Sequence, residues 1–301
     1  MDVDTRLLRY FAAIAEEGNL TRAAHRLFVS QPSLTKQLKH LESQLGVRLF
    51  TRSSTGMKLT EAGHVLAARV SPVLAGWDAA VSETRSAARV LRVGFLSSAA
   101  NDATQDIVAA FGRIRPGWRV DLRQAPWSDP TAGLAAAEVP VALLRLPFPG
   151  EETFGVRALF SESRCVALPS THRLAGRDSV PFHEIRDEPV IVAPALKGAW
   201  RDHWLAVSER DGREVRIGAV VERPDEFLSA IAGGYGIALV PSSASHFHSR
   251  PDVVYVPVTG VSPSEVAVAW LPDAGEAAAD FVRCCLEVTR SRRTACGTRW
   301  G

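Results

Sequence analysis

The sequence has few cysteines and no long apolar run, and these absences argue against a disulfide-rich, metal-finger or membrane-spanning protein. Its four cysteines are Cys165, Cys284, Cys285 and Cys296, and they lack the CxxC spacing of a metal finger or redox pair. We therefore expect reduced, mostly buried thiols rather than a disulfide framework. No window approaches the ~20 apolar residues that span a bilayer, and the N-terminus lacks the apolar segment of a signal peptide. These absences predict a cytoplasmic chain without a membrane span.

Motifs that carry catalytic chemistry are also missing. There is no G-x-S-x-G, no H-E-x-x-H and no phosphate-binding loop. The Gly-Tyr-Gly run at 234–236 resembles the start of a dinucleotide fingerprint, but it precedes an apolar strand, whereas such glycines follow one. His246 and His248 have no cysteine or acidic residue nearby to complete a metal site, which favours a surface turn. The sequence therefore predicts no enzyme, no cofactor and no bound metal.

The charge that is present is unevenly distributed. The whole chain carries a net charge of +2, but residues 1–60 hold nine Lys and Arg against five Asp and Glu. Residues 91–288 hold 19 Lys and Arg against 25 Asp and Glu. A basic segment on an acidic body is the distribution that attraction to DNA phosphates favours.

The basic segment contains helical patterns with clear ends. A first helix is predicted over residues 5–17, and two short amphipathic helices joined by a tight turn follow between residues 20 and 46. Ser30 is placed to cap the second helix of this pair, Pro32 lies in its first turn, and Gly46 ends it. The apolar face of that helix is spaced by four, three and four residues and consists of Leu34, Leu38, Leu41 and Leu45.

The opposite face of this helix carries the side chains that a DNA-reading helix needs. Glutamine bonds adenine through two atoms, lysine reaches guanine or phosphate, and hydroxyls reach either, when the N-terminal end of a helix enters the major groove. The alternative is the ordinary solvated face of a two-helix hairpin. The residues predicted to contact base edges and nearby phosphates are Gln31, Pro32, Ser33, Thr35 and Lys36.

The pattern extends well beyond the hairpin. The residues that carry it, at fixed spacings, are Ala23, Ala24, Leu27, Ser30, Gln31, Pro32, Ser33, Leu34, Thr35, Leu38, Leu41, Glu42, Leu45, Gly46, Leu49, Phe50, Arg52, Leu59, Thr60 and Gly63. This stretch closely resembles the DNA-binding region of LysR-type transcriptional regulators. The resemblance implies an all-α winged helix-turn-helix domain, in which Arg52 and Lys58 of the wing lie over the DNA backbone.

A long helix is predicted after the wing, from Thr60 to about residue 88. Its apolar stripe has no neighbouring segment to cover it, so we expect it to pack on a partner. Pro72 removes one backbone hydrogen bond, which predicts a local kink. The resemblance implies that this linker helix pairs with a second copy of the chain. The predicted dimer contacts are Val65, Leu66, Val70, Val73, Leu74, Trp77 and Val81.

Beyond the linker, short apolar strands alternate with helices, which predicts α/β architecture. A short helix is expected over residues 130–137. The resemblance implies an effector domain of two Rossmann-like subdomains of the periplasmic-binding-protein type. The predicted organisation is a DNA-binding domain at 1–59, a linker helix and hinge at 60–90, an effector domain at 91–290 (subdomain I at 91–161 and 267–290, subdomain II at 162–266) and a basic tail at 291–301.

An effector is expected beyond the carboxyl ends of the strands, where ligands of open α/β sheets bind. Arg145 ends the third strand, and its charge suits a carboxylate; some relatives place a ligand-contacting arginine at this position. A strand-end arginine is as often a member of a structural ion pair, and Trp200 is more often core than pocket wall. The predicted site residues are Ser97, Ser98, Trp127, Ser128, Arg145, Pro194 and Trp200.

These features together predict a LysR-type regulator that binds double-stranded DNA as a homodimer or homotetramer. Its small effector would be an organic or aromatic acid, and RNA polymerase is an expected partner. Two other classes stay open. Residues 91–290 resemble a periplasmic solute-binding protein. The basic segment at residues 1–60 and the absent signal peptide argue against that class. An architectural DNA-binding protein without an effector would leave the α/β residues without a role.

Overall fold

The computed structural model describes residues 3–53, 56–96, 100–194, 198–221 and 224–295. The chain divides into two compact units, Met1–Arg89 and Val90–Gly301. Each unit has a hydrophobic core of its own. None of the described helices is long and apolar enough to cross a membrane.

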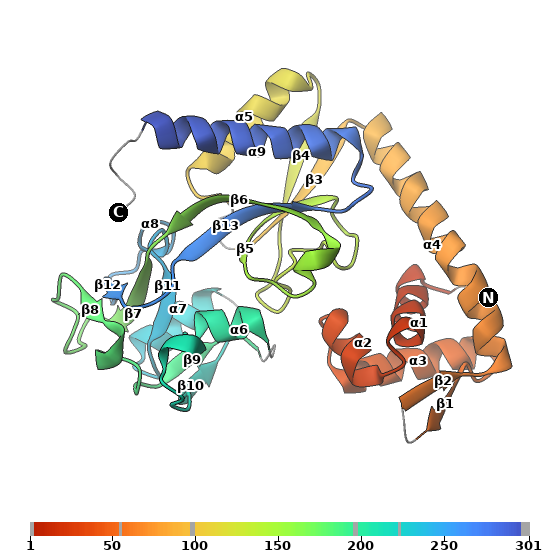
Figure 1. Ribbon diagram of the computed structural model, residues 1–301, viewed down its shortest axis with the longest axis horizontal. Helices are drawn as coiled ribbons and strands as arrows, with labels where there is room; N and C mark the ends of the chain where they lie inside the picture. Colours follow the sequence, from red (N-terminus) through yellow and green to blue (C-terminus); the bar gives the residue numbers. More distant parts are fainter. Residues whose placement is uncertain (1–2, 54–55, 97–99, 195–197, 222–223, 296–301) are drawn as a thin grey trace. The chain divides into compact units, whose positions relative to one another are not determined.

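The first unit is helical apart from one hairpin (Figure 1). Ser30 caps α3 as the sequence predicted, because its hydroxyl accepts a hydrogen bond from the Ser33 N–H at 3.3 Å. Asp4 caps α1 in the same way by accepting from the Arg6 N–H. Gly46 ends the third helix in the left-handed conformation, with φ of 70°. The elements are α1 (Thr5–Glu17), α2 (Leu20–Arg26), α3 (Gln31–Leu45), β1 (Phe50–Ser53), β2 (Gly56–Leu59) and α4 (Glu61–Ala87).

The hairpin β1–β2 is the wing, and it is fastened to the turn between α1 and α2. The Met57 N–H donates to the Gly18 carbonyl oxygen at 2.8 Å. A Cβ atom on Gly56, whose φ is +127°, would lie 2.4 Å from that same oxygen. The close approach therefore requires glycine at this position.

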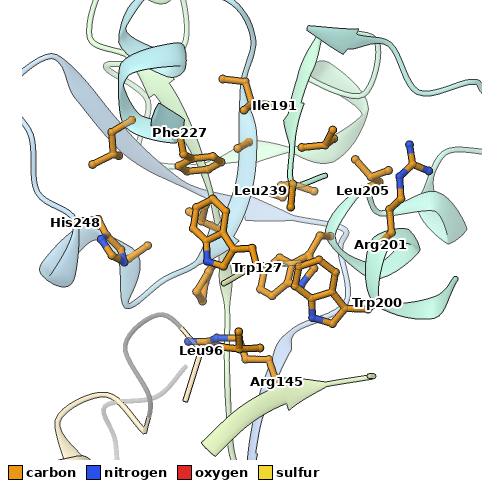
Figure 2. Close-up of a pocket in the computed structure, with 18 of the residues that line it drawn as sticks. Leu96, Trp127, Arg145, Ile191, Trp200, Arg201, Leu205, Phe227, Leu239 and His248 are labelled. Atoms are coloured by element: carbon orange, nitrogen blue, oxygen red, sulfur yellow. The ribbon is translucent and has the colours of Figure 1, made fainter. Parts of the chain in front are cut away.

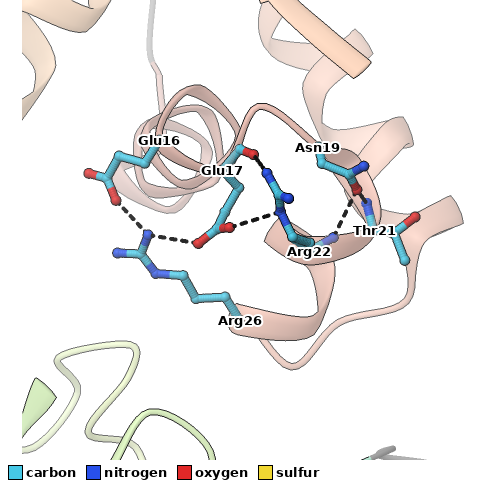
Figure 3. A network of polar contacts seen from close by, with 6 residues as sticks. All are labelled: Glu16, Glu17, Asn19, Thr21, Arg22 and Arg26. Carbon is cyan, nitrogen blue, oxygen red and sulfur yellow. Dashed lines mark hydrogen bonds and ion pairs between the residues drawn. The ribbon is translucent and has the colours of Figure 1, made fainter. Parts of the chain in front are cut away.

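Polar side chains join α1 to α2 (Figure 3). The Arg26 guanidinium lies 2.5 Å from the Glu16 carboxylate and 3.5 Å from that of Glu17. Asn19 caps α2, since its side-chain oxygen accepts from the Thr21 and Arg22 N–H groups at 2.8 and 3.1 Å. These contacts hold α2, the first helix of the helix-turn-helix, in place against α1.

The second unit contains a five-stranded sheet with the order β4-β3-β5-β13-β6. Strand β3 runs parallel to β4 and β5, while β13 is antiparallel to β5 and β6. Helices α5 and α9 pack on one face of this sheet, where Val266 and Val268 of β13 point; Ala267 and Ala269 point to the other face. The elements are β3 (Val90–Phe95), α5 (Ala103–Ile114), β4 (Arg119–Gln124), β5 (Val141–Leu146), β6 (Gly155–Glu162), β13 (Ser264–Trp270) and α9 (Gly275–Ala295).

A second sheet has the order β11-β7-β12-β8, and an isolated parallel bridge between Val190 and Ile237 joins it to the pair β10-β9. The chain crosses between the two sheets from β6 to β7 and from β12 to β13. The elements are β7 (Arg164–Pro169), β8 (Val180–Pro181), β9 (Val190–Val192), α6 (Ala199–Trp204), β10 (Ile217–Val220), α7 (Pro224–Ala232), β11 (Ala238–Pro241), α8 (Ala244–Phe247) and β12 (Val253–Thr259).

Two local expectations are wrong. Residues 130–137 form turns instead of a helix, because Asp129 accepts hydrogen bonds from the Thr131 and Gly133 N–H groups and Ala132 has a positive φ of 52°. The segment from residue 291, predicted as a tail, continues α9 as far as Ala295. Arg292 of this last turn pairs with Asp106 of α5 at 2.6 Å, which holds the end of the helix.

Candidate DNA-binding surface and effector pocket

The N-terminal turns of α3 present polar side chains to solvent. Gln31, Pro32, Ser33 and Lys36 are exposed, whereas the leucines of the same helix are packed against α1 and α2. Thr35 is half-buried, and its hydroxyl donates to the Gln31 carbonyl oxygen at 2.8 Å. The structure therefore gathers all five predicted recognition residues at one end of one helix.

A buried carboxylate connects this helix to the wing. Glu42 of α3 is only 8% exposed, and its Oε1 accepts from the Leu49 and Phe50 N–H groups at 2.8 and 3.3 Å. Sequence reasoning gave Glu42 no role, although an acidic residue directly after Leu41 of the apolar face was a usable signal. The hydrogen bonds fix where the first wing strand begins relative to the recognition helix.

Of the two predicted wing contacts, Lys58 is exposed on β2. Arg52 lies on β1, where it pairs with Met57 of β2. The side chain of Arg52 is outside what the structure describes.

The apolar stripe of α4 serves two purposes. Val65, Val73 and Trp77 are 62%, 56% and 52% exposed, so they are available to a partner. Val70 and Leu74 are only 3% and 8% exposed because they pack in the core of their own unit. The prediction that these two residues are dimer contacts is therefore corrected. Leu66 also packs against that core, and Val81 is half-buried.

A cavity of about 130 Å³ lies in the second unit, lined by residues of both subdomains (Figure 2). Its walls are largely apolar and aromatic. Trp127 meets Phe227 edge to face with ring centroids 5.1 Å apart, and Trp200 meets Trp204 at 6.2 Å. The arrangement is that of a small-molecule pocket.

The predicted effector residues reach this cavity in part. Trp127, Arg145, Pro194 and Trp200 line it, whereas Ser128 does not. Ser97 and Ser98 lie outside the described residues. The prediction missed the contribution of α7 and β11, because Phe227 and Leu239 carried no signal beyond that of ordinary core residues.

Arg145 lines the cavity but is committed to other protein groups. Its guanidinium lies 2.8 Å from the carboxylate of Glu162 at the end of β6 and donates to the Ser264 hydroxyl at 2.8 Å. Both partners are buried, and the Arg145 side chain is 5% exposed. Burial lowers the pKa of Arg145. The guanidinium nevertheless stays charged, because the ordinary pKa of arginine lies far above neutral pH. Burial acts to raise the pKa of Glu162, but the charge of Arg145 holds that pKa below its usual value. The pair is therefore a charged one.

Two of the remaining polar side chains of the pocket, Tyr255 and His248, are uncharged. The Tyr255 hydroxyl donates to the His248 carbonyl oxygen at 2.7 Å, and burial raises the pKa of Tyr255 to about 12. Burial lowers the pKa of His248, so its imidazole is uncharged at neutral pH. The Trp200 Nε1–H and the Arg201 Nε–H, both from residues that line the pocket, are buried without a hydrogen-bond partner. In the described part of the chain, no cluster of His, Cys, Asp and Glu is suited to a metal ion.

Comparison with known proteins identifies the family. Residues 5–64 match the bacterial regulatory helix-turn-helix protein, lysR family, and residues 84–290 match the LysR substrate binding domain. The chain belongs to the LysR family of transcriptional regulators. It is 32% identical to the HTH-type transcriptional regulator BudR of Raoultella terrigena, over 89% of this chain and 94% of that protein.

Solved structures of LysR-family proteins share the fold. Full-length BenM matches with a TM-score of 0.56 and 25% identity, covering 99% of each chain. Full-length CbnR in complex with its target DNA matches with a TM-score of 0.53 and 26% identity, covering 95% of this chain and all of CbnR. The predicted fold class is therefore confirmed, and the LysR-family relatives are transcriptional regulators rather than enzymes or solute-binding proteins.

Proposed function

We propose that this LysR-family regulator reads its operator with the N-terminal turns of α3 in the major groove. The observation that carries the proposal is the exposure of Gln31, Ser33 and Lys36 at the end of a helix whose other face is fully packed. The wing, held to α3 through Glu42, brings Lys58 toward the phosphate backbone. Such contacts combine base reading with charge neutralisation.

Two copies of the head, the first unit of the chain, are needed for an operator with two-fold symmetry. We propose that the exposed edge of α4, formed by Val65, Val73 and Trp77, pairs with a second copy. Three large apolar side chains along one helix edge favour association over exposure to water. The sedimentation coefficient of the purified chain, which should exceed that of a monomer, tests this assignment.

The cavity of the second unit is the proposed effector site. A ligand that binds one arrangement of the subdomains more tightly than another shifts the population toward it, which changes DNA binding or the contact with RNA polymerase. A protein that works on the bacterial chromosome acts in the cytoplasm, where we place this regulator.

The proposal is tested by comparing specific with nonspecific DNA. The operator is first selected from random duplexes, and binding is then measured by fluorescence anisotropy on that site and on an unrelated duplex. Gln31→Ala should cost ~1–3 kcal/mol on the operator and little on the unrelated duplex, because only a base contact discriminates. Lys36→Ala is the matched variant: loss of a phosphate contact should weaken both duplexes and lower the salt slope by about 1. Equal losses from Gln31→Ala on both duplexes would contradict a base-reading role for this residue.

A further inference from the structure

We propose that the pocket takes a single-ring organic molecule whose buried polar group is uncharged, such as an amide, a ketone or a phenol. This inference rests on the proposed role of the cavity as the effector site. It differs from the carboxylate that the sequence favoured, because that expectation took its positive charge from Arg145.

The size and walls of the cavity define the body of the ligand. An engineered apolar cavity of about 150 Å³ holds benzene, and the cavity here measures about 130 Å³. Trp127 and Phe227 on one side and Trp200 on another present aromatic surfaces toward the space between them (Figure 2). A six-membered ring with a small substituent fits these dimensions and buries its apolar surface.

The ion pair determines what charge the ligand carries. The Arg145 charge is matched by Glu162 at 2.8 Å, and a carboxylate entering beside this pair meets a negative charge as well as a positive one. Beside this pair the entering anion would lose its hydration without gaining an unpaired charge from Arg145, and that loss is large in an apolar site. An uncharged ligand avoids this cost.

The other polar groups of the described walls support the same assignment. His248 is uncharged, and the Tyr255 hydroxyl is used within the protein. The Arg201 guanidinium is drawn beyond Leu205, on the side away from Trp127 (Figure 2). Two donors of the wall lack a partner, the Trp200 Nε1–H and the Arg201 Nε–H. Because the Arg201 guanidinium lies on the far side of Leu205, the Trp200 Nε1–H is the donor among the aromatic walls, and a neutral oxygen acceptor satisfies it.

The test uses matched pairs of probes that differ in charge but scarcely in shape. Binding of benzamide and benzoate, and of cyclohexanone and cyclohexanecarboxylate, is measured by calorimetry on the full chain at neutral pH. Each neutral probe should bind at least about tenfold more tightly than its acid. Ala193→Trp, which adds bulk at a half-exposed wall position, should abolish binding while the variant melts as a folded protein.

The outcomes separate this inference from the proposed function. Tighter binding of the acids, in particular binding that Arg201→Gln removes, overturns the assignment of an uncharged ligand and leaves the effector site in place. Binding that persists in Ala193→Trp, or no binding of any probe, overturns the proposed effector site and the ligand class with it.

Discussion

The head (residues 1–89) and the effector domain (residues 90–301) each contain a set of basic residues, and the two sets differ in exposure. In the head, Lys36 and Lys58 are exposed on α3 and β2, the elements proposed to face DNA. In the effector domain, Arg145, Arg164 and Arg210 are 4%, 1% and 2% exposed. Lys36 and Lys58 are surface charges available to a partner, whereas these three arginines are part of the internal framework.

The buried arginines make their hydrogen bonds within the protein, although the Arg164 Nε–H has no partner. Arg164 donates to the carbonyl oxygens of His203 and Trp204 at 3.0 and 3.2 Å and lies over the Trp204 ring at 5.6 Å. Arg210 donates to the Leu205 carbonyl oxygen at 2.8 Å. An arginine beside a ligand pocket is therefore a ligand contact only if no internal partner has taken its charge.

The largest expected effect comes from breaking the Arg145–Glu162 pair. Glu162→Ala leaves a buried guanidinium without its counter-charge, which typically costs ~3–5 kcal/mol. The Asn101 amide and the Ser243 N–H lose the same acceptor. Thermal and urea unfolding of the variant should show a large loss in the transition of the effector domain and little change in that of the head.

A double variant sharpens this prediction. Arg145→Met with Glu162→Leu removes both charges, and apolar replacements of a buried pair are often neutral. The double variant should regain most of the stability that Glu162→Ala loses, although the Ser243 N–H stays unpaired. If the double variant is no more stable than Glu162→Ala, the pair must stabilise the effector domain by more than the matching of its two charges.

The next effect is a pH dependence centred on the half-buried His203. Burial, followed by the nearby charge of Arg164, lowers the pKa of His203 to about 4. Between pH 6.5 and 4 the unfolded chain therefore binds this proton and the folded chain does not, so stability falls as the pH falls through this window. His203→Gln should make the decline in melting temperature over this range shallower. An unchanged slope would assign the decline to other groups.

Features of the head could be predicted because their causes are close in sequence. Ser30 caps a helix through a residue three positions away, and the leucine spacing of α3 defines its buried face. Which residues of the apolar stripe on α4 are exposed and which are packed in the core could not be predicted. Val70 and Trp77 obey the same periodicity, and only the packing of α1 decides that Val70 is core.

The pocket was harder to predict because its contacts are distant along the chain. The Ser264 hydroxyl that binds Arg145 is 119 residues away, on a strand whose pairing the sequence does not specify. Phe227 and Trp127 meet across the two subdomains, and neither carries a local signal for the other. Residue type predicted a charge at the cavity, but only the fold shows that Glu162 neutralises it.

The smallest effect is expected at an ion pair of the head. Arg9 of α1 and Asp78 of α4 form two contacts, at 2.5 and 3.2 Å, with side chains 26% and 40% exposed. Partly exposed pairs contribute about 0.2–1 kcal/mol and are weakened by salt. Asp78→Asn should lower the stability of the head by this amount at low salt and by less at high salt, and Arg9→Asp with Asp78→Arg should restore it. A loss of stability as large as that of Glu162→Ala would contradict the expectation that buried ion pairs matter more than exposed ones in this chain.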